Sequence, residues 1–144
     1  MKNFLIYIVL LTLIGCGYID DDGIIFEEQI VGKFYIRQQA RSEQIGLDYV
    51  EDLQRGTGVV EDCNKLIYDS IRKEIFVERR LWDSASSYYL INIIDENAEK
   101  SLGAFKKKEI FEKTFFNKID TCKHCLIWDM TVKRRIDKTK TEQQ

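Results

Sequence analysis

Two consecutive segments rich in β-branched and aromatic residues constrain the fold of this chain most strongly. Residues 73–82 alternate in polarity, which places Ile75 and Val77 on one face of an extended strand. Residues 83–86 are turn-forming, and residues 87–95 are apolar on both faces, as is typical of a strand covered on both sides. The pattern therefore predicts an antiparallel hairpin whose second strand is central in a sheet.

Other short apolar-aromatic runs, separated by Gly, Asp, Asn and Ser, predict further strands at 24–30, 33–39 and 63–68, with a bend at Val31-Gly32. Residues 47–53 fit either a helix or a strand. The sequence Arg55-Gly56-Thr57-Gly58 predicts a turn, and it lacks the pattern of a phosphate-binding loop.

The periodicity changes after a polar turn at 96–103. Phe111, Phe115 and Ile119 recur every four residues, with Lys106–Lys108 on the polar side, which predicts an amphipathic helix of about 14 residues. The expected fold class is α+β, with one small antiparallel sheet and this helix packed on it, in a single domain over residues 24–130. Residues 131–144 lose their apolar members after Ile136, so we expect a frayed tail there.

The N-terminus predicts an export signal. Residues 4–14 are apolar except for Thr12 and follow Lys2, and this run is shorter than the about 20 residues that cross a bilayer. It ends in Leu13-Ile14-Gly15-Cys16, which resembles the lipobox of bacterial lipoproteins. The resemblance implies a signal peptide over residues 1–15, cleavage before Cys16 and a diacylglycerol anchor carrying palmitate-like chains on that cysteine. The alternative is an ordinary secretory leader with an incidental cysteine.

Residues 16–23 then form an acidic tether. Asp20-Asp21-Asp22 resembles the surface-export signal of Bacteroidetes lipoproteins, and the alternative is a solvated linker in which adjacent carboxylates repel one another. Gly17 stands where many Gram-negative lipoproteins retained in the inner membrane carry aspartate. The predicted location is the cell envelope, anchored to the outer membrane in a Gram-negative cell and open to export to the surface.

Residues 30–118 resemble an uncharacterised family of short bacterial lipoproteins. The resemblance rests on hydrophobic motifs: Ile67-Tyr68-Asp69, Glu74-Ile75-Phe76-Val77, Tyr88-Tyr89-Leu90-Ile91, Gly103-Ala104-Phe105 and Phe111. The resemblance implies that two strands are followed by a helix, and it does not indicate an activity. It does not require the cysteine-containing extension after Asp120.

Three cysteines remain once Cys16 is lipidated. We expect a structural disulfide from Cys63 to Cys122 or Cys125, with Cys122–Cys125 as the second pairing, because thiols oxidise outside the cytoplasm. A redox pair at Cys122 and Cys125 is a further alternative, but this CxxC follows a helix in a chain without proline. A zinc site formed by Cys63, Cys122, His124 and Cys125 is the last alternative.

The functional expectation is a lipid-anchored, non-catalytic binding domain with a protein partner and no cofactor. A net charge of −2 provides no basic surface for nucleic acid. Arg79, Arg80 and Trp82 form the candidate binding patch, and a solvated strand edge is its alternative. The narrower alternatives are an immunity or inhibitor lipoprotein that blocks a toxin or hydrolase, and a thiol-active or zinc-binding envelope protein that uses Cys122 and Cys125.

Overall fold

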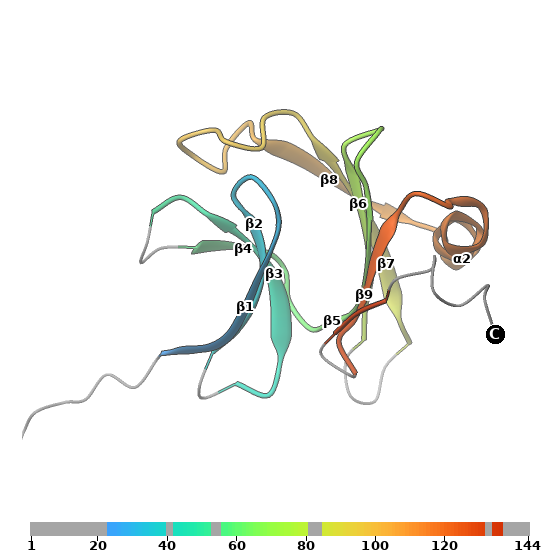
Figure 1. Cartoon of the computed structure of the whole chain (residues 1–144), viewed down its shortest axis with the longest axis horizontal. Coiled ribbons are helices and arrows are strands. Elements are labelled where there is room, and N and C mark those ends of the chain that lie inside the picture. The colour runs from blue at the N-terminus through green and yellow to red at the C-terminus, as the bar shows by residue number, and fades with distance from the viewer. Residues whose placement is uncertain (1–22, 40–41, 53–55, 81–84, 132–133, 137–144) are drawn as a thin grey trace, which may run out of the picture.

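The computed structural model describes residues 23–39, 42–52, 56–80, 85–131 and 134–136. The predicted signal peptide, Cys16, the tether before Gly23 and Trp82 lie outside these residues. The described part is a stack of three layers, in which two antiparallel sheets face each other and one helix covers the far side of the second sheet (Figure 1).

The first sheet has four strands in sequence order: β1 (Ile24–Val31), β2 (Phe34–Gln39), β3 (Ile45–Val50) and β4 (Gly56–Val60). The second sheet has six strands in the spatial order β10 (Arg134–Ile136), β9 (Leu126–Asp129), β5 (Cys63–Asp69), β6 (Glu74–Arg79), β7 (Ser87–Ile93) and β8 (Phe105–Ile110). Helix α2 (Glu112–Thr121) follows β8. We call the face of the six-stranded sheet that meets the first sheet its inner face, and the face under α2 its outer face.

The main core lies between the two sheets. Alternate residues of β2 and β3 point inward, as the two-residue period of a strand requires, so Phe34, Leu47 and Tyr49 are buried. The Phe34 ring packs edge-on against Tyr49, with 5.0 Å between ring centroids, and against Phe105 at 5.7 Å. The six-stranded sheet contributes the inner-face residues Leu66, Tyr68, Ile75, Val77, Ile91 and Ile93.

A second, smaller core covers the outer face. Phe115 of α2 is fully buried and packs against Tyr88, with 5.2 Å between ring centroids. The other buried members are Ile67, Phe76, Leu90, Cys122, Cys125 and Ile127. Because β7 contributes residues to both cores, the prediction of a strand covered on both faces is confirmed for Ser87–Ile93, and the strand ends two residues earlier than the predicted range 87–95.

The α+β class is confirmed, but the expectation of one small sheet is wrong. The strands divide between two sheets because the chain crosses over after β4, and strand pairing between distant segments leaves no local sequence signal. The predicted turn at residues 55–58 is also wrong for its described part, since Gly56, Thr57 and Gly58 belong to β4 and pair with β3.

The helix is shorter than predicted and begins later. Residues Lys106–Lys108 lie in edge strand β8, where pairing with β7 leaves the other side of the strand exposed. Phe111 precedes the helix and is 85% exposed, so it is not part of the predicted apolar stripe. The segment expected to be a frayed tail contains β10, which pairs with β9.

Candidate functional site

Asp69 ends strand β5 and is the most deeply buried carboxylate in the described chain, with 1% of its surface exposed. Its Oδ1 accepts hydrogen bonds from the backbone N–H groups of Ile71 and Arg72, each at 3.0 Å. This arrangement is the local turn that aspartate favours, because its short side chain bonds to the backbone two and three residues ahead. The β5–β6 turn therefore fixes the carboxylate in one orientation.

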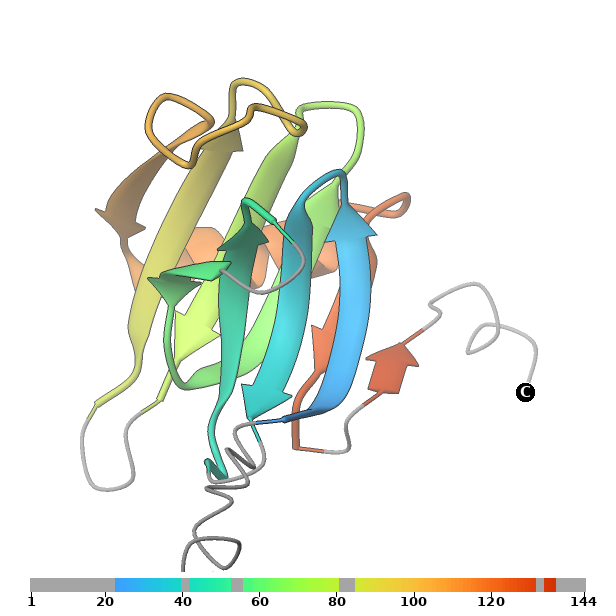
Figure 2. The ribbon, with the colours of Figure 1, turned by 90° about the vertical axis from the view of Figure 1, so that its left-hand side faces the viewer.

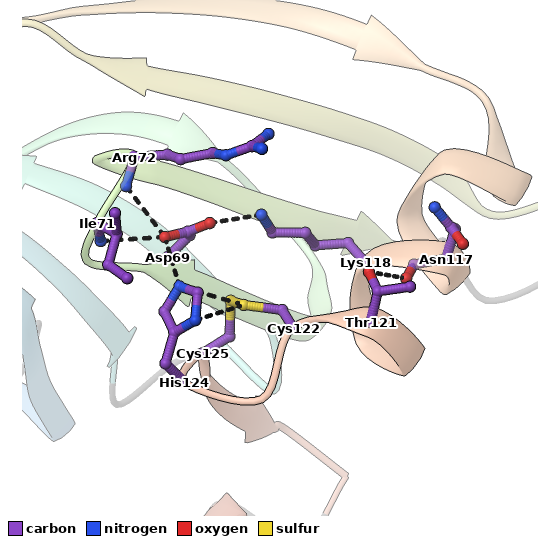
Figure 3. The surroundings of a disulfide bond; sticks show 9 residues. All are labelled: Asp69, Ile71, Arg72, Asn117, Lys118, Thr121, Cys122, His124 and Cys125. Atoms are coloured by element: carbon purple, nitrogen blue, oxygen red, sulfur yellow. Dashed lines mark hydrogen bonds and ion pairs between the residues drawn. A yellow bond between two sulfur atoms is a disulfide. The ribbon is translucent and has the colours of Figure 1, made fainter.

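Two cationic or potentially cationic side chains from distant segments meet this carboxylate (Figure 3). Lys118 of α2 donates from Nζ to Asp69 Oδ2 at 2.5 Å, and His124 Nε2 lies 3.0 Å from Oδ1. Burial alone would raise the pKa of Asp69, but the hydrogen bonds from Lys118, His124 and the Arg72 N–H outweigh it and hold that pKa well below its ordinary value. Asp69 is therefore an ionised, fully partnered group.

A disulfide joins Cys122 to Cys125 beside this carboxylate. Cys122 follows the last residue of α2, and Cys125 precedes β9, so the bond ties the end of the helix to the start of a strand. His124 lies between the two cysteines, and its Nε2 is 3.5 Å from the Cys122 sulfur. We call Asp69, Lys118, Cys122, His124 and Cys125 the Asp69 cluster.

Cys63 does not take part in this cluster, so the bridge that we expected from Cys63 is replaced by the second pairing. Cys63 begins β5 and belongs to the core between the sheets, whereas Cys122 and Cys125 belong to the core on the outer face. The Cys63 thiol is free and donates to the Val60 carbonyl at 3.3 Å. Burial raises its pKa to about 12, which makes it a poor nucleophile.

The four residues predicted to bind zinc do not all lie together, because Cys63 belongs to the core between the sheets. Cys122, His124 and Cys125 lie together, but Asp69 takes the position expected for Cys63, and one potential ligand atom from each of these four residues lies within 4.8 Å of the others. The predicted set missed Asp69 because the contact joins residues 55 positions apart in sequence. An aspartate ending a strand-like run indicates the turn, but no sequence signal indicates Lys118 or His124 as its partners.

The cluster opens to a polar cavity of about 390 Å³ between the β5–β6 turn and α2, lined also by Arg72, Thr114, Asn117 and Thr121. The arrangement does not favour thiol catalysis. Both sulfurs are buried, and Cys122 stands at the C-terminal end of the helix, where the backbone dipole disfavours a thiolate. In its oxidised form the cluster has a structural role, because the disulfide and the Lys118–Asp69 ion pair fix α2 to the six-stranded sheet.

Of the predicted binding patch, the structure describes Arg79 and Arg80, and Trp82 lies outside the described residues. Arg79 points toward the inner side, where its Nη2 lies 3.6 Å from Asp62 Oδ2, and it lines a cavity with Tyr89 and Lys107. Arg80 is exposed and lines a different cavity near Cys63. Arg80 follows the last residue of β6, and its backbone N–H donates to the Asp62 carbonyl at 3.1 Å.

Comparisons with protein-family models, with curated proteins and with solved structures returned no match. The resemblances to lipoproteins at residues 13–16 and 30–118 therefore remain predictions. Within the described ranges, no helix combines the length and apolarity needed to cross a bilayer.

Proposed function

We propose that this chain is a lipid-anchored bacterial envelope protein whose two-sheet domain binds a protein partner. The observation that carries the proposal is the buried disulfide between Cys122 and Cys125. Disulfides persist in oxidising compartments outside the cytoplasm and are rare within it. The disulfide and the lipobox-like Leu13-Ile14-Gly15-Cys16 are independent features that favour the same compartment.

The proposed anchor gives the domain an orientation. Strand β1 begins at Ile24, eight positions after Cys16, and a chain of that length can reach at most about 28 Å, so the start of β1 would lie within that distance of the membrane. The β5–β6 turn and the β7–β8 loop lie at the opposite end of the stack (Figure 2). They contact each other, because Lys73 Nζ of the turn lies 3.6 Å from Glu96 Oε2 of the loop. This end would face away from the membrane.

The membrane-distal end carries exposed aliphatic side chains that suit a protein partner. Ile71 of the β5–β6 turn is 74% exposed, and Ile94 and Leu102 of the β7–β8 loop are 57% and 92% exposed. Large apolar side chains on adjoining loops are a common basis of protein recognition, since their burial is favourable. We therefore assign partner binding to these two loops in place of Arg79, Arg80 and Trp82.

The anchor is tested by replacing Cys16 with Ser in the native cell. The wild-type protein should incorporate labelled palmitate and sediment with membranes, and Cys16→Ser should do neither while its described domain keeps its fold. A wild-type product that lacks the label and retains its leader would contradict the proposal.

Partner binding is tested by affinity capture of the tagged, lipidated protein. Leu102→Asp and Ile71→Asp should lose the captured partner, whereas Phe111→Asp, at an equally exposed position after β8, should retain it. Equal recovery with all three variants would contradict the assignment to the distal loops. A captured toxin or hydrolase that is inhibited on binding would identify the narrower immunity or inhibitor function.

A further inference from the structure

We propose that reduction of the Cys122–Cys125 disulfide converts the Asp69 cluster into a zinc site with the ligands Cys122, Cys125, His124 and Asp69. This inference goes beyond partner binding and does not depend on the lipid anchor. It concerns a second chemical state of the same residues, in which coordination of a zinc ion replaces the disulfide bond as the link between α2 and the sheet.

The positions of the ligand atoms are close to those that a tetrahedral zinc ion requires. Zn–S bonds of about 2.3 Å and Zn–N bonds of about 2.0 Å place neighbouring ligand atoms roughly 3.5 Å apart. The four ligand atoms already lie within 4.8 Å of one another, and His124 Nε2 is 3.5 Å from the Cys122 sulfur. Once the S–S bond is broken, the sulfurs need to separate by only about 1.5–2 Å to fit this geometry.

The carboxylate is held in place before any metal binds. Asp69 is fixed by the Ile71 and Arg72 N–H groups and is 1% exposed, so a metal would not need to order it. Such outer hydrogen bonds orient metal ligands and strengthen binding. His124 is the accessible ligand, with 45% of its side chain exposed, and the adjoining cavity gives an ion access to the cluster.

The charges around the site also balance. Two cysteine thiolates and Asp69 supply three negative charges, Zn²⁺ supplies two positive charges, and Lys118 supplies the third through its bond to Asp69 Oδ2. A neutral His124 adds no charge. A buried site with no net charge avoids the large cost of an uncompensated ion, which explains why Lys118 beside the carboxylate is compatible with a cation there.

The conversion needs a dithiol reductant. The dithiol gives two electrons to the Cys122–Cys125 bond and becomes a disulfide, and its two protons pass to the cysteine sulfurs. Zinc then binds both sulfurs as thiolates and releases these protons to solvent. The disulfide and the metal exclude each other, because each uses the same two sulfurs.

The test uses Co²⁺ as a spectroscopic probe of zinc sites, with the full chain in detergent. After reduction, the wild-type chain should bind one Co²⁺ and show the thiolate charge-transfer and tetrahedral ligand-field bands, which Zn²⁺ should then abolish. The oxidised chain should show none of these bands. Cys63→Ser is the matched cysteine control and should bind as the wild type does.

The ligand set is tested by single substitutions. Cys122→Ser and His124→Gln should lose the wild-type spectrum, and Lys118→Gln, which removes an outer partner, should weaken binding by about 10–100-fold. His124→Gln changes an exposed side chain, so it remains informative even if Asp69→Asn fails to fold. A reduced wild-type chain without thiolate bands, or a His124→Gln variant with an unchanged spectrum and affinity, would overturn the proposal.

Discussion

The two faces of the six-stranded sheet are both apolar, but they are covered in different ways. The inner face packs against four strands whose alternate side chains interdigitate with it, and aromatic contacts such as Phe34–Tyr49 close this core. The outer face is covered by α2, which has only ten residues and no side-chain cap at Phe111. Helices this short are marginal in isolation, so tertiary ties must hold it.

Those ties lie at both ends of the helix. At its start, the Tyr88 hydroxyl donates to Glu112 at 3.2 Å, and at its end Lys118 bonds to Asp69 and Cys122 forms the disulfide. Hydrophobic burial is the main stabilising interaction at the inner face, whereas the outer layer combines a smaller buried core with specific polar and covalent bonds. Substitutions that remove one kind of interaction from one face test this difference.

The largest effect is expected from a matched pair of aromatic truncations. Phe34→Ala on the inner side should lower the free energy of unfolding by about 4–5 kcal/mol, and Phe115→Ala on the outer side by about 3 kcal/mol. Both rings are fully buried, but a single helix can move into the space left by Phe115 more easily than two sheets can close around Phe34. Denaturant unfolding measures both values, and the reverse order would contradict the comparison.

Removing the carboxylate of Asp69 should have the next largest effect. Asp69→Asn leaves Lys118 without its ionic partner and should cost about 3 kcal/mol at pH 7. Because the folded-state pKa of Asp69 is lowered, its contribution is present above the ordinary value of 3.8 and is lost as pH falls through that value and below it.

The wild type should therefore lose stability in acid more steeply than Asp69→Asn does. Asp95→Asn is the matched control, because Asp95 also accepts a backbone N–H, from Asn97 at 3.0 Å, but is exposed. Denaturant unfolding as a function of pH gives all three profiles. If the free energy of unfolding fell equally steeply in acid for the wild type and Asp69→Asn, the ionised Asp69 carboxylate would not be the source of the acid sensitivity.

Loss of the disulfide should have a smaller, local effect. The double variant Cys122→Ser/Cys125→Ser opens a short loop and should cost about 2 kcal/mol. The loss should appear as faster amide hydrogen exchange in α2 than in the wild type. Amide exchange in β2 and β3 should change less than it does in α2. Cys63→Ala, in the inner core, should leave amide exchange in α2 unchanged relative to that in β2 and β3. If both variants accelerated exchange in α2 equally, the proposed difference between the two faces would be wrong.

Truncation of Phe111 should have the smallest effect. Phe111→Ser should change the free energy of unfolding by less than about 0.5 kcal/mol, because that ring is 85% exposed. Thermal and denaturant unfolding measure this change. A loss above about 1 kcal/mol would show that the ring contributes to the outer core.

The sequence predicted the strands best where the residue pattern reflects burial. Strands β6 and β7 were found because alternating or continuous apolar residues follow directly from their covered faces. Strand β8 was missed, since the three consecutive lysines of an exposed edge strand resemble the polar side of a helix. Strand β4 was missed because Gly56 and Gly58, exposed in an edge strand, are also typical of a turn.

The site was predicted only in part. The residues Cys122, His124 and Cys125 were identified because they are adjacent in sequence, so their proximity needs no tertiary information. Asp69 and Lys118 were not, because their contact depends on how α2 lies across the outer face. The choice of disulfide partner failed for the same reason, since sequence does not reveal that Cys63 faces the other side of the sheet.

The most direct measurement is the intact mass of the chain isolated from bacterial membranes and unfolded in an alkylating agent without reductant. We predict a leaderless product that carries a diacylglyceryl group at position 16, a single alkylated thiol at Cys63 and an intact Cys122–Cys125 disulfide. A full-length product with its cysteines all alkylated would contradict both the envelope location and the covalent closure of the outer layer.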